Sequence, residues 1–246
     1  MIKVLNYTKE PLKEMGKAAS ICYDSIELED IINNAKTKTA KGIARHCLKS
    51  GHDRVAEFAD VTIIVNEYSI RMIREFYVHL IGVSKLQQST RYVKYDGVNF
   101  GYFTPGKINS NEEAKAIYDG CMNHIIDSYI KLLDLGIPKE DAANVLPLGQ
   151  HTTITCKINV RALEHMFSIR ECTRAYHEFR KFMKELRKAL YELDEDWAYL
   201  CDNYFKVKCE KMLYCAEKES CGRFPAKSEL ELALQYYKAN KGKIIT

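Results

Sequence analysis

An alternating segment that leads directly into a helical one constrains the fold of this chain most strongly. Residues 151–159, with the sequence HTTITCKIN, place Ile154, Cys156 and Ile158 at alternate positions between threonine, lysine and asparagine. This alternation is typical of a strand with one buried face. The adjoining residues 160–171, VRALEHMFSIRE, repeat their apolar side chains with helical spacing. A strand joined without a gap to an amphipathic helix predicts a chain of mixed strand and helix content.

Other segments support the mixed class. Strands are expected at residues 1–7 and in the β-branched run at 59–65. Helices are expected at residues 8–23, 27–49, 70–81, 109–135, 138–145 and 174–193. The helix at 109–135 carries an apolar stripe that we expect to face the core, made of Ala114, Ile117, Tyr118, Cys121, Ile125, Tyr129 and Leu132. No linker divides the chain, so we predict one domain over residues 1–246, with a cysteine-containing extension at about 201–246.

The composition argues against several classes of protein. Hydrophobic residues make up 46% and charged residues 28% of the 246 residues, as in an ordinary globular protein. The net charge of +4 is small and dispersed, so we expect no nucleic-acid partner, although it suits an anionic small molecule. No apolar run reaches the length of a membrane span, so we expect no membrane partner. Nine cysteines, an odd number, without a signal peptide favour free thiols in a reducing cytoplasm.

A dense polar segment follows the expected helix at 70–81. Ser69 is the expected N-cap of that helix, and Gly82 is its expected stop. The hydroxyl, amide and guanidinium side chains that follow are Ser84, Gln87, Gln88, Ser89, Thr90 and Arg91. Guanidinium groups match phosphate, while serine and glutamine side chains both donate and accept hydrogen bonds. This segment is therefore a candidate site for a phosphate and the edge of a base, with a solvated loop as the alternative.

The same polar segment resembles part of a family signature. Residues 84–92, SKLQQSTRY, are similar to the second half of the signature of flavin-dependent thymidylate synthases, which ends in Ser-x-Arg-Tyr. Where that signature begins with Arg-His-Arg, this chain has HLI at 79–81. Residues 51–57 resemble the family's Gly-His turn and its glutamate. Residues 159–170, NVRALEHMFSIR, resemble its Asn-x-Arg-x-Leu-x-His-Phe segment and the arginine that follows.

The resemblance implies a fold, an activity and an assembly. The fold would be α+β, a mixed sheet packed with helices. The activity would be methylation of deoxyuridine monophosphate at C5 to give thymidylate, with FAD as cofactor and with NADPH and methylenetetrahydrofolate as co-substrates. The assembly would be a homotetramer whose sites are shared between subunits.

The resemblance also assigns roles to individual residues. Arg170 falls on the arginine that hydrogen-bonds the uracil ring and favours loss of its N3 proton, a catalytic role. The residues implied to bind the pyrimidine nucleotide are Gln87, Gln88, Ser89, Arg91 and Arg170. The residues implied to bind the flavin are His79, Glu57, Asn159, Arg161 and His165.

Departures from the family pattern leave three hypotheses open. His79 and Ile81 replace two guanidinium groups, and Ala143 stands where the family has an arginine that reaches the nucleotide phosphate. Each charge-assisted hydrogen bond is worth about 1.5–3 kcal/mol, so the loss of two weakens binding by about a hundredfold or more. The candidates to compensate for this lost positive charge are Arg54, Arg71, Arg74 or Lys85. The chain is a divergent flavin-dependent thymidylate synthase, an enzyme of the same scaffold acting on another pyrimidine nucleotide, or a non-catalytic nucleotide-binding or assembly protein.

The tail raises the question of a metal. Cys209, Cys215 and Cys221, with Cys201, are similar to a cysteine-rich extension of some family members, and their thiolates are suitable ligands for zinc. Their spacing lacks the paired C-x-x-C pattern of structural zinc sites. We therefore assign no metal to the chain.

Overall fold

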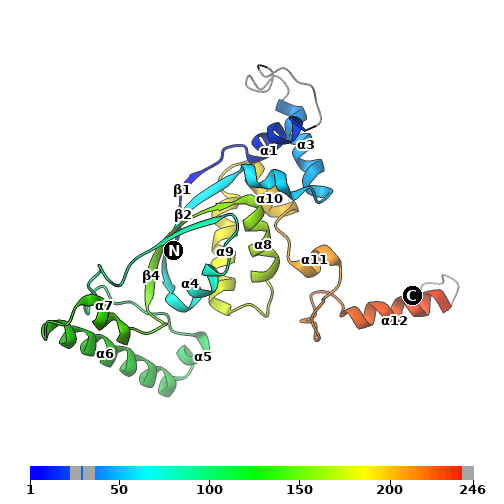
Figure 1. The fold of residues 1–246 in the computed structure, drawn as a ribbon. Helices are drawn as coiled ribbons and strands as arrows, with labels where there is room; N and C mark the ends of the chain where they lie inside the picture. The colour runs from blue at the N-terminus through cyan, green and yellow to red at the C-terminus, as the bar shows by residue number, and fades with distance from the viewer. Residues whose placement is uncertain (23–28, 30–36, 240–246) are drawn as a thin grey trace. The chain divides into compact units, whose positions relative to one another are not determined.

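The computed structural model describes residues 1–22, 29 and 37–239 and comprises two compact units, Met1–Ala162 and Leu163–Thr246. Figure 1 shows the helices and strands of both units. The α+β class expected from the sequence is confirmed. The single-domain organisation stays a prediction. No described helix combines the length and the apolar character that crossing a membrane requires.

An antiparallel sheet organises the first unit. Its strands, in the spatial order β1-β2-β4-β3, are β1 (Ile2–Tyr7), β2 (Asp60–Ser69), β4 (His151–Asn159) and β3 (Val83–Gln87). The two central strands pair from Asp60 opposite Asn159 to Ser69 opposite His151. Alternate residues of both strands are fully buried, as the alternation in the sequence predicts. The expectation of a mixed sheet is corrected in one respect, since every described strand pairing is antiparallel.

Strand β3 lies where the sequence indicates only a polar segment. It pairs with β4 from Val83 opposite Ile158 to Gln87 opposite Ile154. Its side chains alternate between half-buried and exposed, and Leu86 is 80% exposed. β3 is the last strand in the sheet order, and edge strands tolerate polar and charged side chains because one side faces no further strand. The polar composition therefore concealed a strand.

The helices that precede and follow β2 begin and end with recognisable signals. They are α1 (Pro11–Ser20), α3 (Thr37–Lys49), the 3-10 helix η1 (Asp53–Phe58) and α4 (Ile70–Tyr77). The hydroxyl of Ser69 accepts from the N–H of Met72, which confirms the predicted N-cap of α4. The hydroxyl of Thr8 accepts from the N–H of Asp60, which joins the residue after β1 to the start of β2. Residues 27–28 and 30–36 of the helix predicted at 27–49 lie outside the described residues.

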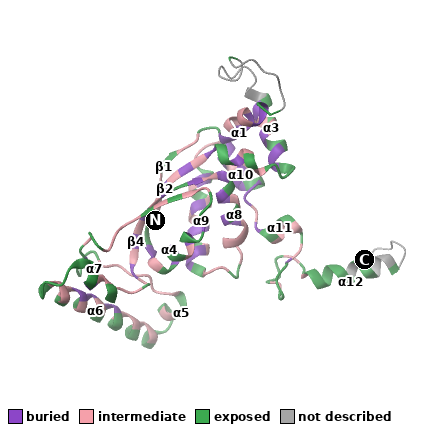
Figure 2. Cartoon of the chain, viewed as in Figure 1, coloured by how far each residue is buried: buried purple, intermediate pink, exposed green. Residues whose placement is uncertain are grey.

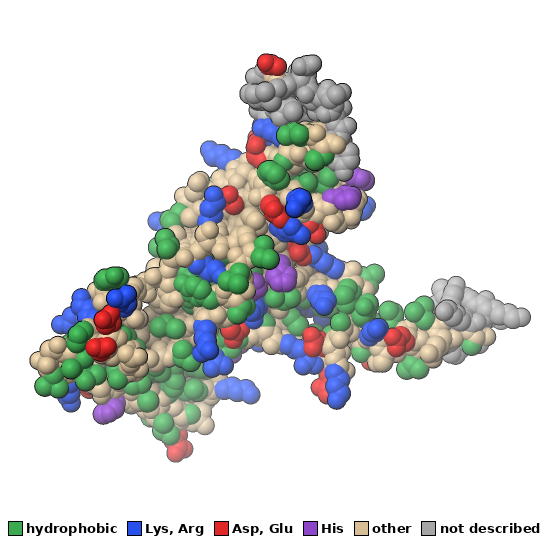
Figure 3. Space-filling model, viewed as in Figure 1, with side chains coloured by type: hydrophobic (Ala, Val, Ile, Leu, Met, Phe, Trp, Pro, Cys, Tyr) green, Lys and Arg blue, Asp and Glu red, His purple; other side chains and the backbone are tan. Residues whose placement is uncertain are grey.

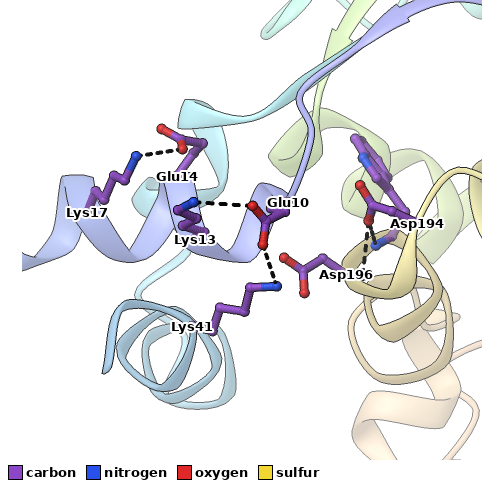
Figure 4. Close-up of polar contacts among 8 residues, drawn as sticks. Glu10, Lys13, Glu14, Lys17, Lys41, Asp194 and Asp196 are labelled. Carbon is purple, nitrogen blue, oxygen red and sulfur yellow. Dashed lines mark hydrogen bonds and ion pairs between the residues drawn. The ribbon is translucent and has the colours of Figure 1, made fainter. Parts of the chain in front are cut away.

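Helices α1 and α3 pack at close range. A Cβ atom at Gly16 would lie 1.8 Å from the backbone oxygen of Ala40, so only glycine permits this approach. Figure 4 shows the ion pairs around the start of α1, where Glu10 meets Lys13 at 3.2 Å and Lys41 of α3 at 3.1 Å. The Lys41 ammonium, followed by that of Lys13, lowers the pKa of the Glu10 carboxyl.

The helical segment between β3 and β4 buries only part of the predicted stripe. Its elements are α5 (Gly106–Asn109), α6 (Glu112–Asp134), α7 (Lys139–Ala142) and η2 (Ala143–Val145). The residues of α6 that are buried are Met122, Ile126 and Tyr129 (Figure 2). From the predicted stripe, Ile117 is 69% exposed and Cys121 is exposed. Apolar residues occupy two adjacent faces of this helix, and contact with Tyr95 and Ala142 decides which face is buried.

The second unit is helical. It holds the end of α8 (Val160–Arg170), then α9 (His177–Tyr191), α10 (Glu195–Asn203), α11 (Lys208–Met212) and α12 (Lys227–Ala239). The ring of Phe167 stacks on Phe205 at 4.8 Å. Arg187 lies over Phe167 and donates to both carboxylate oxygens of Glu171 at 3.0 and 2.7 Å, so this guanidinium joins two helices and the chain between them. Asp194 caps α10 by accepting from two backbone N–H groups (Figure 4).

Candidate functional site

One end of the sheet in the first unit brings together several residues that the sequence implicated. Asp60, at the start of β2, pairs with Asn159, at the end of β4. The N–H of Asn159 donates to the carbonyl of Gly82 at 2.9 Å, which places the entry of β3 beside the exit of β4. We refer to this region, formed by residues 57–60, 79–82 and 159–161, as the Asn159 end of the sheet. On the face drawn in Figure 3, charged and hydrophobic side chains are interspersed.

Asn159 itself is held by the fold. Its side-chain oxygen accepts from the N–H of Ala162 at 2.8 Å and so caps the first turn of α8. Gly82 has a φ of 72°, a left-handed conformation that favours glycine. A Cβ atom at Gly82 would lie 2.5 Å from the same side-chain oxygen. The Asn159 side chain therefore caps α8 and leaves no room for a side chain at the turn before β3.

Arg161 and Glu57 form a surface ion pair at the Asn159 end. A guanidinium nitrogen of Arg161 lies 2.5 Å from a carboxylate oxygen of Glu57, with the side chains 49% and 39% exposed. Lys157 and Asp60 pair nearby on the central strands at 3.1 Å. Beside these charges, Phe58 presents a ring that is 61% exposed. The result is a surface with polar donors and acceptors next to an apolar face.

Residues 79–81 are divided between the core and the solvent. His79 is 7% exposed, and its ring lies near Phe76. Leu80 and Ile81 are 74% and 88% exposed, so they do not fill a cavity in the described chain. Their aliphatic side chains add to the apolar surface beside Gly82.

Lys85 serves the turn that precedes β3. Its ammonium donates to the carbonyls of Tyr77, at 3.2 Å, and His79, at the end of α4. A cation at a helix C-terminus satisfies carbonyls that lack helical partners. Burial lowers the pKa of the Lys85 ammonium. Lys85 therefore fixes the backbone of this turn, and the prediction that it could replace a lost guanidinium is not supported by where it lies.

The predicted nucleotide-binding residues lie at the other end of β3. Gln87 donates from its amide to the hydroxyl of Thr152 at 3.2 Å, and the hydroxyl of Ser89 accepts from the N–H of Arg91 at 3.3 Å. Arg91 is paired with Glu140 at 2.8 Å and remains largely exposed. With about 3.3 Å per residue, β3 separates this segment from the Asn159 end by roughly 13 Å.

A cavity of about 320 Å³ adjoins the predicted nucleotide segment. Of the residues predicted to bind substrate, Gln88 lines it, together with amide, hydroxyl and imidazole groups that the sequence did not single out, including Asn66, Asn99, His151 and Thr153. His151 is the first residue of β4, whose bounds the sequence predicted. Its position at the end of a strand could have marked it as a candidate site residue.

Two implicated residues belong to the second unit. The guanidinium of Arg170 lies 4.7 Å from the centre of the Phe179 ring, a cation–π contact that orients it at the end of α8. His165 lies on the same helix. Arg170 is half-buried, whereas His165 is exposed.

Comparison with known proteins shows to which family the chain belongs. The family model described as thymidylate synthase complementing protein matches residues 3–194 of the chain. The chain belongs to this family. A flavin-dependent thymidylate synthase of Geobacter sulfurreducens is 31% identical over 185 residues, covering 75% of this chain and 79% of the relative. Relatives of the same name from Nitratidesulfovibrio vulgaris and Pyrococcus furiosus are 30% and 28% identical, covering 93% and 89% of this chain and 97% and 90% of their own lengths.

The Asn159 end of this thymidylate synthase family member has the chemistry that a flavin ring requires. A flavin presents two apolar faces and an edge of carbonyl and ring nitrogen atoms. Phe58, Leu80 and Ile81 offer exposed apolar surface, and Arg161 offers N–H donors for such an edge. Apolar surface and N–H donors of the kind that suits a flavin ring are therefore present together at this end of the sheet.

Proposed function

We propose that this protein methylates deoxyuridine monophosphate at C5 to give thymidylate, with FAD as cofactor and with methylenetetrahydrofolate and NADPH as co-substrates. The observation that carries the proposal is the Asn159 end of the sheet, where the Glu57–Arg161 pair lies beside exposed apolar side chains in a chain of this family. In this proposal the reaction takes place in the cytoplasm, where free thiols such as those of this chain persist.

The protein's contribution to this reaction is positioning and electrostatics. Flavin, when bound, supplies the hydride chemistry. Arg161 donates to the polar edge of the ring, and Glu57 orients that guanidinium. Arg170 carries a fixed positive charge that stabilises a uracil ring deprotonated at N3, because a preorganised cation favours the anionic form. Gln88, with Ser89 and Arg91, binds the nucleotide and its phosphate through amide, hydroxyl and guanidinium groups.

FAD and deoxyuridine monophosphate both carry phosphate groups, so the site that binds them requires several positive charges. At the Asn159 end, Lys85 serves backbone carbonyls, and Lys157 and Arg161 each face a carboxylate. Arg54, an exposed residue near the start of η1, is a candidate to meet one phosphate. Further positive charge has to come from elsewhere, so we propose a homotetramer in which another copy completes the site.

Release of tritium from C5-labelled deoxyuridine monophosphate tests the activity. With FAD, NADPH and methylenetetrahydrofolate present, the wild-type protein is expected to release tritium. Arg170→Ala is expected to lower the rate by about a hundredfold, since it removes a charge aimed at the transition state. Arg170→Lys keeps the charge without the planar fork and should retain intermediate activity. Equal release by all three proteins would overturn the assignment of Arg170.

The second candidate is a nucleotide-binding protein without flavin chemistry. The exposure of Leu80 and Ile81, where the family signature has histidine and arginine, favours it. Such a protein would be colourless after purification and would bind deoxyuridine monophosphate with or without FAD. An enzyme acting on another pyrimidine nucleotide would instead bind FAD and release no tritium from this substrate.

A further inference from the structure

The second unit contains a cavity of about 340 Å³ that is rich in sulfur. Its walls come from the end of α8, the connection to α9, α11 and the segment before α12, all within residues 168–223. The side chains with sulfur that line it are those of Cys172, Cys209, Met212, Cys215 and Cys221. The volume falls within the range of about 300–1,000 Å³ that small-molecule sites occupy.

Cys221 differs from the other thiols of this cavity. It is exposed, whereas Cys172 and Cys209 are half-buried and Cys215 is buried. The hydroxyl of Thr173 and the backbone N–H of Arg223 both donate hydrogen bonds to its sulfur. These two donors, together with the Arg223 charge, lower the pKa of the Cys221 thiol. Burial has the opposite effect elsewhere, raising the pKa of Cys209 here and that of Cys156 in the sheet to about 12.

The charges around the cavity favour an anionic ligand. Four basic side chains line it, those of Arg170, Arg174, Lys208 and Arg223, against two acidic ones, those of Glu217 and Glu219. One pair is already formed, since Arg174 lies 3.5 Å from the carboxylate of Glu217. The remaining balance is positive, and positive walls raise the local concentration of anions.

The arrangement of the thiols points to covalent chemistry rather than to a metal. Within the part of the chain that the structure describes, no three cysteine, histidine or acidic side chains are placed to hold a metal ion. A nucleophilic thiolate in a positive cavity is instead the arrangement that reacts with an electrophilic sulfur.

We propose that this cavity is a site of thiol–disulfide exchange, in which Cys221 reacts with a small anionic disulfide. The thiolate of Cys221 attacks one sulfur of the disulfide. A new sulfur–sulfur bond forms as the original one breaks, and the other half leaves as a thiolate that takes up a proton from water. The protein sulfur is oxidised and the small disulfide is reduced, so no other oxidant is required.

Glutathione disulfide, which is anionic, and cystamine, which is a cationic disulfide, test the proposal on the full chain. After each reduced protein sample is treated at the same pH, mass spectrometry of its peptides gives the rate of modification at every cysteine. Glutathione disulfide is expected to modify Cys221 at least tenfold faster than Cys121, an exposed thiol on α6 that serves as the internal control. Cystamine is expected to lose this preference for Cys221.

Two variants distinguish the effect of the cavity on the reactivity of Cys221 from the effect of its exposure alone, and a third serves as a control. Thr173→Val removes the hydroxyl donor and keeps the cysteine, and should slow modification of Cys221 severalfold. Arg223→Gln should slow the reaction with glutathione disulfide by about tenfold and the reaction with cystamine much less, because the lost charge attracts the anion and repels the cation. Cys221→Ser should leave no modified residue in that peptide, with an unchanged melting temperature as the folding control. Modification of Cys121 as fast as Cys221, or equal rates with both disulfides, would overturn the proposal.

Discussion

Two segments that lie side by side at the Asn159 end of the sheet relate to the family in opposite ways. Residues 159–161 match the family pattern, whereas residues 79–81 carry His-Leu-Ile in place of Arg-His-Arg. The backbone N–H of Asn159 donates to the carbonyl of Gly82, the residue after 79–81, so the two segments are joined by a hydrogen bond. The difference lies in what their side chains do. Asn159 caps a helix and packs on Gly82, while Leu80 and Ile81 face solvent.

Residues that the fold requires and residues that only change the surface therefore lie next to each other at the Asn159 end. The fold itself requires Asn159, so its match is evidence for the scaffold and weak evidence for flavin binding. The exposed side chains of Leu80 and Ile81 add little to the stability of the fold. Substitution of these two residues should therefore change mainly what the surface binds. Arg161 is the informative residue, because its half-exposed pair with Glu57 adds little stability, while the proposed function gives its guanidinium a ligand to bind.

The largest expected effect on stability is at Gly82. Gly82→Ala forces a Cβ into a left-handed backbone, at about 1–2 kcal/mol, and displaces the Asn159 cap, worth about 1 kcal/mol more. Urea denaturation should show a loss of about 2–3 kcal/mol in the free energy of unfolding. Gly97→Ala is the control, since a Cβ atom added at Gly97 would meet no other atom within 4 Å. Equal stability of both variants would show that the two segments are not coupled.

A smaller effect is expected at Asn159 itself. Asn159→Ala removes the cap of α8 and should lower the free energy of unfolding by about 1 kcal/mol, whereas Asn159→Asp keeps an accepting oxygen and should stay close to wild type. Thermal and urea unfolding of the three proteins measures this. If aspartate destabilises as much as alanine, the amide nitrogen rather than the cap is what the site requires.

The smallest effect on stability is expected at Ile81. Because its side chain is 88% exposed, Ile81→Arg should change the free energy of unfolding by no more than about 0.5 kcal/mol. The same substitution restores one guanidinium of the family signature, and one charge-assisted hydrogen bond should tighten FAD binding by about tenfold. Titration of the variant with FAD, alongside Ile81→Gln as a neutral control, measures the change. A variant that gains no affinity would place the flavin away from residues 79–81.

The sequence predicted the parts of the fold that local patterns determine. The bounds of β4 and the cap at Ser69 are confirmed, because alternation and capping act within a few residues. Strand β3 was missed, since its pairing with β4 is a long-range contact and its polar edge composition resembles a loop. The buried face of α6 was predicted only in part, since Tyr129 of the predicted stripe is buried whereas Ile117 and Cys121 are exposed. Either apolar face satisfied the periodicity, and Tyr95 and Ala142 decide between them.

The predicted site residues show the same division. Arg161 lies 104 residues after Glu57 in the sequence and only two after Asn159, and the register of β2 with β4 brings all three to one end of the sheet. The resemblance to the family predicted their roles, but only the structure shows that Asn159 is a cap. Lys85, a candidate to compensate for lost charge, instead serves the carbonyls after α4, a contact that depends on β3.

Binding of FAD to Arg161→Ala, compared with wild type and with Lys157→Ala as a matched control, tests the central claim most directly. Both variants break an exposed ion pair, so both should unfold within about 1 kcal/mol of wild type. We predict that wild-type protein and Lys157→Ala quench flavin fluorescence with similar affinity and that Arg161→Ala binds FAD at least tenfold more weakly. Wild-type protein that leaves FAD fluorescence unchanged, or an Arg161→Ala variant that binds as tightly as wild type, would contradict the account.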